Sequence, residues 1–211
     1  MHGTLLFYSS LVFAAVAFSF GISEIYTYSN HVRRTVREGG AAAFAKKLGN
    51  EMRTDRGNSL LTIILLWSSI SIGWLAYGAT PRYLFFPGPA YMYVLAGAAI
   101  ILTGIAVRRW SMAALGNMFT HLLSIQRNHR VVTEGPYKIV RHPSYLGGFL
   151  AVIGFGVAMG NLAGLLPCII MPMIAYYIRI RKEEKMLSER LGQAYKKYSL
   201  SVRYRIIPHV W

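Results

Sequence analysis

The chain of 211 residues is rich in apolar side chains and poor in charge, with 54% hydrophobic and 15% charged residues and a mean hydropathy of +0.37. Such a composition has too little polar material to coat a soluble globule, so it predicts a lipid-facing surface. The 23 Lys and Arg against 8 Asp and Glu lie mainly between apolar runs. This pattern is typical of basic loops beside membrane helices, and we expect no nucleic-acid partner.

Five apolar runs follow in chain order, at 5–25, 60–79, 90–107, 145–159 and 162–178. Each is near the length that spans a bilayer, so we expect an all-α integral membrane protein with about five transmembrane helices. No Lys or Arg precedes the first run and no small-residue cleavage site follows it, so it is predicted to be a mature helix rather than a signal peptide. Only Gly160 and Asn161 separate the last two runs, which predicts a tight C-terminal helical hairpin.

The basic residues of the loops predict the orientation of these helices. The first loop contains Arg33, Arg34, Arg37, Lys46, Lys47, Arg53 and Arg56, whereas the loop at 80–89 contains only Arg82. Because Lys and Arg concentrate in cytoplasmic loops, we expect the N-terminus outside and both the segment 108–144 and the tail after Arg179 in the cytoplasm.

The chain is predicted to form a single membrane domain over residues 1–211. Residues 1–107 would supply three N-terminal spans and the basic cytoplasmic loop, whose role the sequence does not assign. Residues 108–211 would supply a cofactor-binding region with the helical hairpin and a cytoplasmic tail.

Small residues in the last two runs indicate packing rather than chemistry. Gly156, Gly160 and Gly164 recur every four residues, which favours close helix approach in lipid over a nucleotide-binding loop. The single Cys168 excludes an intrachain disulfide and a thiolate metal cluster, and we expect no metal.

Polar residues concentrate where the fourth run begins. Pro143 can occupy the first turn of a helix, which places Arg141 and His142 at the helix entrance. Free N–H groups and the positive end of the helix dipole there suit a carboxylate, such as that of a cofactor bearing an amino acid. The alternative is an interfacial anchor, in which Arg141 snorkels, His142 caps the helix and Tyr145 joins the aromatic belt.

A second polar cluster closes the last run. Arg179 and Glu183 are one helical turn apart and therefore share a face, and the adjacent Glu183 and Glu184 are two of only 8 acidic residues. The alternative here is an exposed ion pair at spacing i,i+4, worth a few tenths of a kcal/mol.

Taken together, these motifs resemble the isoprenylcysteine carboxyl methyltransferase family. The pattern runs His129-x-Val-Val-Thr-x-Gly-x-Tyr137, Arg141-His142-Pro143-Ser144-Tyr145, Arg179-x-x-x-Glu183-Glu184-x-x-Leu187 and Leu191-Gly192-x-x-Tyr195-x-x-Tyr198. It spans residues 115–208, and the stretch 55–59 before the second run shows no equally specific signature.

The resemblance implies a membrane methyltransferase dependent on S-adenosylmethionine, with a cofactor pocket between the hairpin helices and the flanking cytoplasmic segments. Carried over by motif, it implies cofactor contacts at His129, Arg130, Val131, Val132, Tyr137, His142, Pro143, Ser144, Tyr145 and Glu183. It also implies an acceptor-side, catalytic role for Arg179, with Glu183 as the second catalytic residue.

The expected reaction is methyl transfer to a lipophilic acceptor resident in the membrane, such as the carboxylate of a prenylcysteine. A carboxylate is already ionised at neutral pH, so it needs no general base, and Arg179 would orient it through two parallel hydrogen bonds. Other activities stay open: methylation of a phospholipid or small thiol, reduction by an NADPH-dependent membrane enzyme of the sterol type, and a non-catalytic membrane protein.

Overall fold

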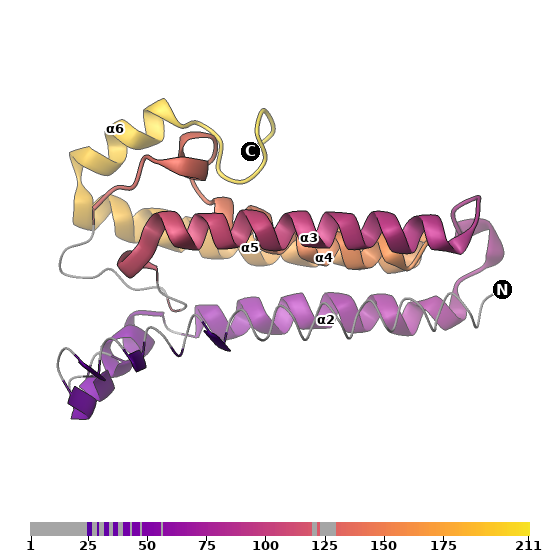
Figure 1. Cartoon of the computed structure of the whole chain (residues 1–211), viewed down its shortest axis with the longest axis horizontal. Helices are drawn as coiled ribbons and strands as arrows, with labels where there is room; N and C mark the ends of the chain where they lie inside the picture. The colour runs from indigo at the N-terminus through magenta and orange to yellow at the C-terminus, as the bar shows by residue number, and fades with distance from the viewer. Residues whose placement is uncertain are drawn as a thin grey trace.

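The computed structural model describes residues 57–119, 122 and 130–211, together with 25–26, 29, 32–33, 36–37, 40–42, 44–46 and 48–55. Its long helices are α2 (Asn58–Ala79), α3 (Ala90–Leu115), α4 (Pro143–Ala158), α5 (Leu162–Leu191) and α6 (Gln193–Ser201) (Figure 1). Short 3-10 turns lie at Arg82–Leu84, Gly116–Met118 and Gly135–Lys138. Among the described residues there is no strand beyond one isolated bridge, and the all-helical prediction is confirmed. The predicted first span, 5–25, falls almost wholly outside the described residues, and so does His129.

Among the residues that the structure describes, three helices are long and apolar enough to cross a membrane. They are α2, α3 and α5, of 22, 26 and 30 residues. The predicted fourth span, α4, is apolar but has 16 residues. At 1.5 Å per residue that is roughly 24 Å, somewhat shorter than a hydrocarbon core of about 30 Å. The chain is an integral membrane protein, while the number of its spans and their orientation stay predictions.

Two helices continue well beyond the apolar runs that predict them. α3 runs to Leu115 and α5 to Leu191, where the sequence predicts apolar runs that end at residues 107 and 178. The charged second half of α5 contains no Gly or Pro and many good helix formers, so the helix persists where the hydropathy falls. It ends at Gly192, whose φ of 54° few other residues adopt. The polar cluster that begins at Arg179 therefore lies on a rigid helix rather than in a loose tail.

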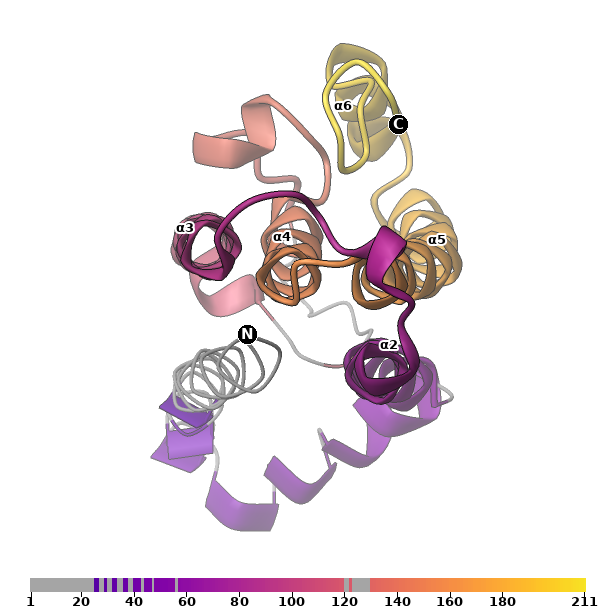
Figure 2. The ribbon, with the colours of Figure 1, turned by 90° about the vertical axis from the view of Figure 1, so that its right-hand side faces the viewer.

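The helices form a layer with polar elements over one end. Viewed along the helices, α3, α4 and α5 lie side by side, and α2 packs against α5 on one face of this layer (Figure 2). On the opposite face lie α6 and the 3-10 turn Gly135–Lys138, at the end of the layer where α4 begins (Figure 1).

The predicted hairpin is confirmed, and Asn161 stabilises it. The Asn161 side chain accepts a hydrogen bond from the Gly164 N–H at 2.8 Å and donates to the Met159 carbonyl at 3.0 Å. It thereby caps α5 while holding the end of α4, and Gly160 makes the turn with a φ of 65°. As predicted, α4 begins at Pro143.

Glycines allow close contact along the layer. A Cβ on Gly104 of α3 would lie 2.6 Å from the carbonyl oxygen of Gly147 in α4, and a Cβ on Gly156 would lie 2.9 Å from the Cβ of Cys168 in α5. The packing role predicted for Gly156 is therefore confirmed, whereas Gly160 belongs to the turn. The close approach of α3 to α4 holds the start of α4 in place, together with the polar residues there.

We expect Gly104→Ala to destabilise the protein by roughly 1–3 kcal/mol, because the new methyl group meets backbone atoms that cannot turn aside. Thermal unfolding in detergent measures this effect. Gly49→Ala is the matched control, since its Cβ would have nothing within 4 Å, and it should not lower the unfolding temperature. Equal unfolding temperatures for the two variants would show that α3 and α4 can separate at little cost.

Candidate functional site

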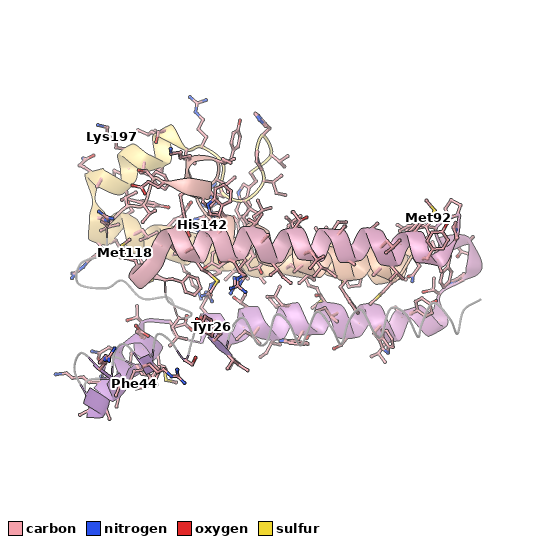
Figure 3. The ribbon with its side chains drawn as sticks, viewed as in Figure 1. Tyr26, Phe44, Met92, Met118, His142 and Lys197 are labelled. Atoms are coloured by element: carbon pink, nitrogen blue, oxygen red, sulfur yellow. The ribbon has the colours of Figure 1, made fainter. Side chains whose placement is uncertain are left out.

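The entrance of α4 is tied to the C-terminal segment, residues 202–211. The N–H of Arg141 donates to the Tyr204 carbonyl at 2.9 Å, and the N–H of His142 donates to the Arg205 carbonyl at 2.8 Å. These two N–H groups are therefore not free for a ligand. Neither does the His142 side chain cap the helix. It lies at the end of the helical layer that α6 covers (Figure 3).

Glu184 joins three parts of the chain that are distant in sequence. Its carboxylate accepts hydrogen bonds from Nε of Arg141 at 2.8 Å and from Nε of Arg205 at 2.9 Å. His142 Nε2 lies 3.3 Å from the same carboxylate, whose side chain is only 14% exposed. Glu184 is thus a largely buried clamp between α5, the entrance of α4 and the C-terminal segment, rather than half of a solvated ion pair.

Tyr145 links Arg179 to Glu183. Its hydroxyl accepts a hydrogen bond from Arg179 Nε at 2.7 Å and donates one to Glu183 Oε2 at 2.5 Å. The ring stacks between those of His142 and Tyr176, with centroid distances of 5.6 and 5.1 Å. Arg179 and Glu183 do share a face of α5, as predicted, but they meet through an aromatic hydroxyl from α4.

The other side of the Arg179 guanidinium is held by α2. Arg179 Nη1 donates to Ser59 Oγ at 2.7 Å, and Ser59 Oγ donates in turn to Asp55 Oδ1 at 2.6 Å. All three residues are buried. Asp55 and Ser59 are absent from the site predicted from the sequence. The sequence offered one signal: Asp55 lies about a turn before the apolar run 60–79, and an acidic residue is costly to bury without a partner.

Tyr137 and Ser144 lie in the same region. Burial raises the pKa of the Tyr137 phenol well above its usual value of 10.0, and the charge of Glu183 raises it further, so this group is neutral at pH 7. The Tyr137 carbonyl accepts a hydrogen bond from the Tyr198 hydroxyl at 2.9 Å. Ser144 Oγ accepts one from Arg108 Nη1 at 3.0 Å, which brings an arginine of α3 to the site that the sequence did not assign to it.

The predicted segment 130–132 is less closely tied to the cluster. It lies in irregular structure before the 3-10 turn, with Arg130 exposed and Val131 and Val132 half-buried. The Arg130 N–H donates to Met118 Sδ at 3.5 Å. Contacts of these residues with a cofactor stay predictions, as does that of His129.

The Tyr145 hydroxyl lies between a buried cation, Arg179, and an accessible anion, Glu183. Arg179 is 7% exposed, whereas the Glu183 side chain is 30% exposed. No described residue donates a hydrogen bond to Glu183 Oε1, which leaves an acceptor for a ligand. Within the described part of the chain, no group of three or more His, Cys, Asp or Glu side chains is placed to hold a metal ion.

Comparisons with known proteins point to one family. Residues 96–189 match the model of the isoprenylcysteine carboxyl methyltransferase (ICMT) family. Protein-S-isoprenylcysteine O-methyltransferase B of Arabidopsis thaliana is 32% identical over 123 residues, covering 56% of this chain and 62% of the relative. Protein-S-isoprenylcysteine O-methyltransferase of Schizosaccharomyces pombe is 31% identical over 113 residues, covering 53% and 48%.

The fold has a counterpart of known structure. A eukaryotic intramembrane Ras methyltransferase, ICMT, superposes with a TM-score of 0.51 and 20% identity, covering 99% of this chain and 98% of the other. The matched segments span less than two thirds of the length of the Arabidopsis and fission-yeast relatives. Residues 96–189, which match the family model, carry Tyr145, Arg179 and Glu183, and the chain is similar in part to isoprenylcysteine carboxyl methyltransferases.

Proposed function

We propose that this chain is an integral membrane methyltransferase that uses S-adenosylmethionine to methylate the carboxylate of a lipophilic, prenylcysteine-like acceptor. The observation that carries the proposal is the single hydroxyl of Tyr145 that joins the buried Arg179 to the accessible Glu183. A buried cation suits an anionic acceptor, and an accessible carboxylate suits a cationic cofactor. The match of residues 96–189 to the family model and the methyltransferase activity named for the similar proteins support the same reaction.

Arg179 is the group that orients the acceptor. A guanidinium grips a carboxylate with two parallel hydrogen bonds, and exclusion of water strengthens such a charged pair. The acceptor needs no general base, because a carboxylate with a pKa near 4 is ionised at neutral pH. The task of the protein is then to align the reacting groups and keep them dry.

The residues around Glu183 fit the cofactor. The free acceptor oxygen of Glu183 suits an ammonium group or the hydroxyls of a ribose, and His142 and Tyr145 lie beside this carboxylate. Pro143, Ser144 and Tyr137 complete this half of the site, and residues 129–132 flank it. When bound, S-adenosylmethionine supplies a methyl group already activated by its sulfonium, so no metal is needed.

The membrane supplies the acceptor and the cytoplasm the cofactor. A lipophilic acceptor reaches Arg179 sideways between helices, from the bilayer in which α2 and α5 lie. The polar elements over the start of α4 face the cytoplasm in the orientation that the basic loops predict. A five-span, multi-pass protein with its active site on the cytoplasmic side meets both requirements.

Calorimetric titration of the purified protein with S-adenosylhomocysteine tests the cofactor. We expect saturable binding, and we expect Glu183→Gln to weaken it about 10- to 100-fold, the loss typical of a hydrogen bond to a charged group. Glu189→Gln is the matched control, because this acid of α5 is 65% exposed and pairs with exposed Lys185. It should leave affinity unchanged.

The same titration separates the alternatives. Binding of NADPH without binding of S-adenosylhomocysteine would replace the proposal with a membrane reductase. Binding of neither would leave a non-catalytic membrane protein, whose polar residues anchor helix ends. If S-adenosylhomocysteine binds, transfer of labelled methyl groups to a prenylcysteine but not to phospholipid or a small thiol completes the assignment.

A further inference from the structure

The first turn of α4 is contacted by charged side chains from both neighbouring helices. α4 lies between α3 and α5 and packs against each of them (Figure 2). From α3, Arg108 Nη1 donates a hydrogen bond to Ser144 Oγ at 3.0 Å. From α5, Glu183 Oε2 accepts the hydroxyl of Tyr145 at 2.5 Å. Because Ser144 and Tyr145 are consecutive residues, a cation and an anion reach the same helical turn from opposite neighbours.

Tyr137 lies in the fields of both charges. It belongs to the 3-10 turn Gly135–Lys138, which packs against α3, and it is 7% exposed. Burial raises the pKa of its phenol, the charge of Glu183 raises it further, and the charge of Arg108 lowers it. The phenol is therefore near both groups, and it stays neutral at pH 7, where its hydroxyl can donate or accept a hydrogen bond.

A cation and an anion beside a neutral hydroxyl suit a zwitterion. An ion of one sign would meet one favourable and one unfavourable charge here, whereas an α-amino acid group carries a carboxylate and an ammonium on the same carbon. The carboxylate also gains from the positive end of the α4 dipole, because α4 begins at Pro143. The cofactor of the proposed function has such an amino acid group at one end.

We propose that Arg108 binds the carboxylate of the cofactor's amino acid group while Glu183 binds its ammonium, so that the two residues together select a zwitterion. Arg108 is half-buried and the Glu183 side chain is 30% exposed, so a ligand can reach both. A guanidinium has five N–H groups, so the bond to Ser144 does not exclude a carboxylate. Arg108 precedes the motifs of residues 115–208, which give it no role. This inference rests on the proposed function.

Two analogues of S-adenosylhomocysteine separate the two charges. In the decarboxylated analogue hydrogen replaces the carboxylate, and in the deaminated analogue hydrogen replaces the ammonium. Calorimetric titration of the purified protein with all three ligands gives their affinities. For the unaltered protein we expect each analogue to bind about 10- to 100-fold more weakly than S-adenosylhomocysteine, the loss typical of a hydrogen bond to a charged group.

Arg108→Gln and Glu183→Gln should show opposite selectivities. Arg108→Gln removes the positive charge but keeps an N–H donor for Ser144 Oγ. We expect it to weaken S-adenosylhomocysteine and the deaminated analogue about 10- to 100-fold, and to leave the affinity for the decarboxylated analogue unchanged or higher. Glu183→Gln should weaken S-adenosylhomocysteine and the decarboxylated analogue, and it should leave the affinity for the deaminated analogue unchanged or higher.

Two further variants control for charge and for folding. Arg109→Gln is the matched control, because this neighbouring arginine of α3 is exposed, and it should bind all three ligands as the unaltered protein does. Arg108→Lys keeps the positive charge without the planar guanidinium, so it should recover part of the affinity for the deaminated analogue. Thermal unfolding in detergent without ligand completes the set. If Arg108→Gln unfolded at a lower temperature and bound all three ligands equally more weakly, Arg108 would only hold α3 against α4, and the proposal would be overturned.

Failure of this inference is distinguishable from failure of the proposed function. If the unaltered protein binds S-adenosylhomocysteine, but Arg108→Gln binds the three ligands as Arg109→Gln does, then only the role of Arg108 is overturned. If Glu183→Gln weakens both analogues equally, the pairing of Glu183 with the ammonium is overturned. If the unaltered protein binds no S-adenosylhomocysteine, the proposed function fails first and this inference with it.

Discussion

Arg179→Ala is expected to lower kcat/KM for methyl transfer by a factor on the order of 10²–10³, the loss typical when one aligned donor is removed from a buried reacting site. In the proposed function Arg179 grips the carboxylate of the acceptor, and its buried guanidinium is held by Tyr145 and Ser59. Affinity for S-adenosylhomocysteine should change little, because Glu183 and its bond to Tyr145 remain. Transfer from labelled S-adenosylmethionine to a prenylcysteine measures the effect.

Two further variants keep this prediction testable. Arg179→Lys retains the positive charge but lacks the planar guanidinium, so it should recover only part of the activity. Because it keeps a positive charge near Asp55, it also guards against loss of folding. Arg181→Ala removes an exposed arginine of α5 whose partner is the Tyr177 hydroxyl, and it should retain full activity. Full turnover in Arg179→Ala would remove this residue from the site.

Glu184→Gln is expected to destabilise the fold by about 3 kcal/mol, because removing one partner of a buried ion pair leaves the other charge uncompensated. Two arginines lose their counter-charge: Arg141, whose side chain is 7% exposed, and Arg205, at 27%. For a chain of this size the loss corresponds to a fall of roughly 6–12 °C in unfolding temperature. Thermal unfolding in detergent checks it.

The neighbouring acids provide the contrast for this result. Glu183→Gln should lower ligand affinity with a small effect on stability, since its side chain is 30% exposed, and Glu189→Gln should do neither. If Glu184→Gln and Glu189→Gln unfolded at the same temperature, the contacts of Glu184 with Arg141 and Arg205 would not stabilise the fold. The two adjacent glutamates are thus expected to separate into one that binds and one that holds the fold together.

The parts of the fold that depend on local sequence could be predicted. Pro143 starts α4 and Gly160 turns the hairpin, because each acts through its own backbone geometry. The shared face of Arg179 and Glu183 follows from helical spacing alone. The extension of α5 to Leu191 was missed, because hydropathy reports where lipid ends rather than where a helix ends.

The partners of the site residues depend on contacts between distant segments. Ser59 and Arg179 are 120 residues apart, and Arg108 and Ser144 are 36 apart, so no spacing rule connects them. Glu183 and Glu184 point about 100° apart on a helix, and only the placement of α4 and the C-terminal segment decides which one is clamped. The motif resemblance named Tyr145, Arg179 and Glu183, which lie together in the structure, but it named no residue of α2.

Because the guanidinium is gripped from two helices, the site has two halves with separate origins in the chain. Tyr145 and Glu183 lie in the matched region, while Asp55 and Ser59 precede it. Substitutions at Asp55 or Ser59 are therefore expected to change how Arg179 is held while the hydrogen bond from Tyr145 to Glu183 remains.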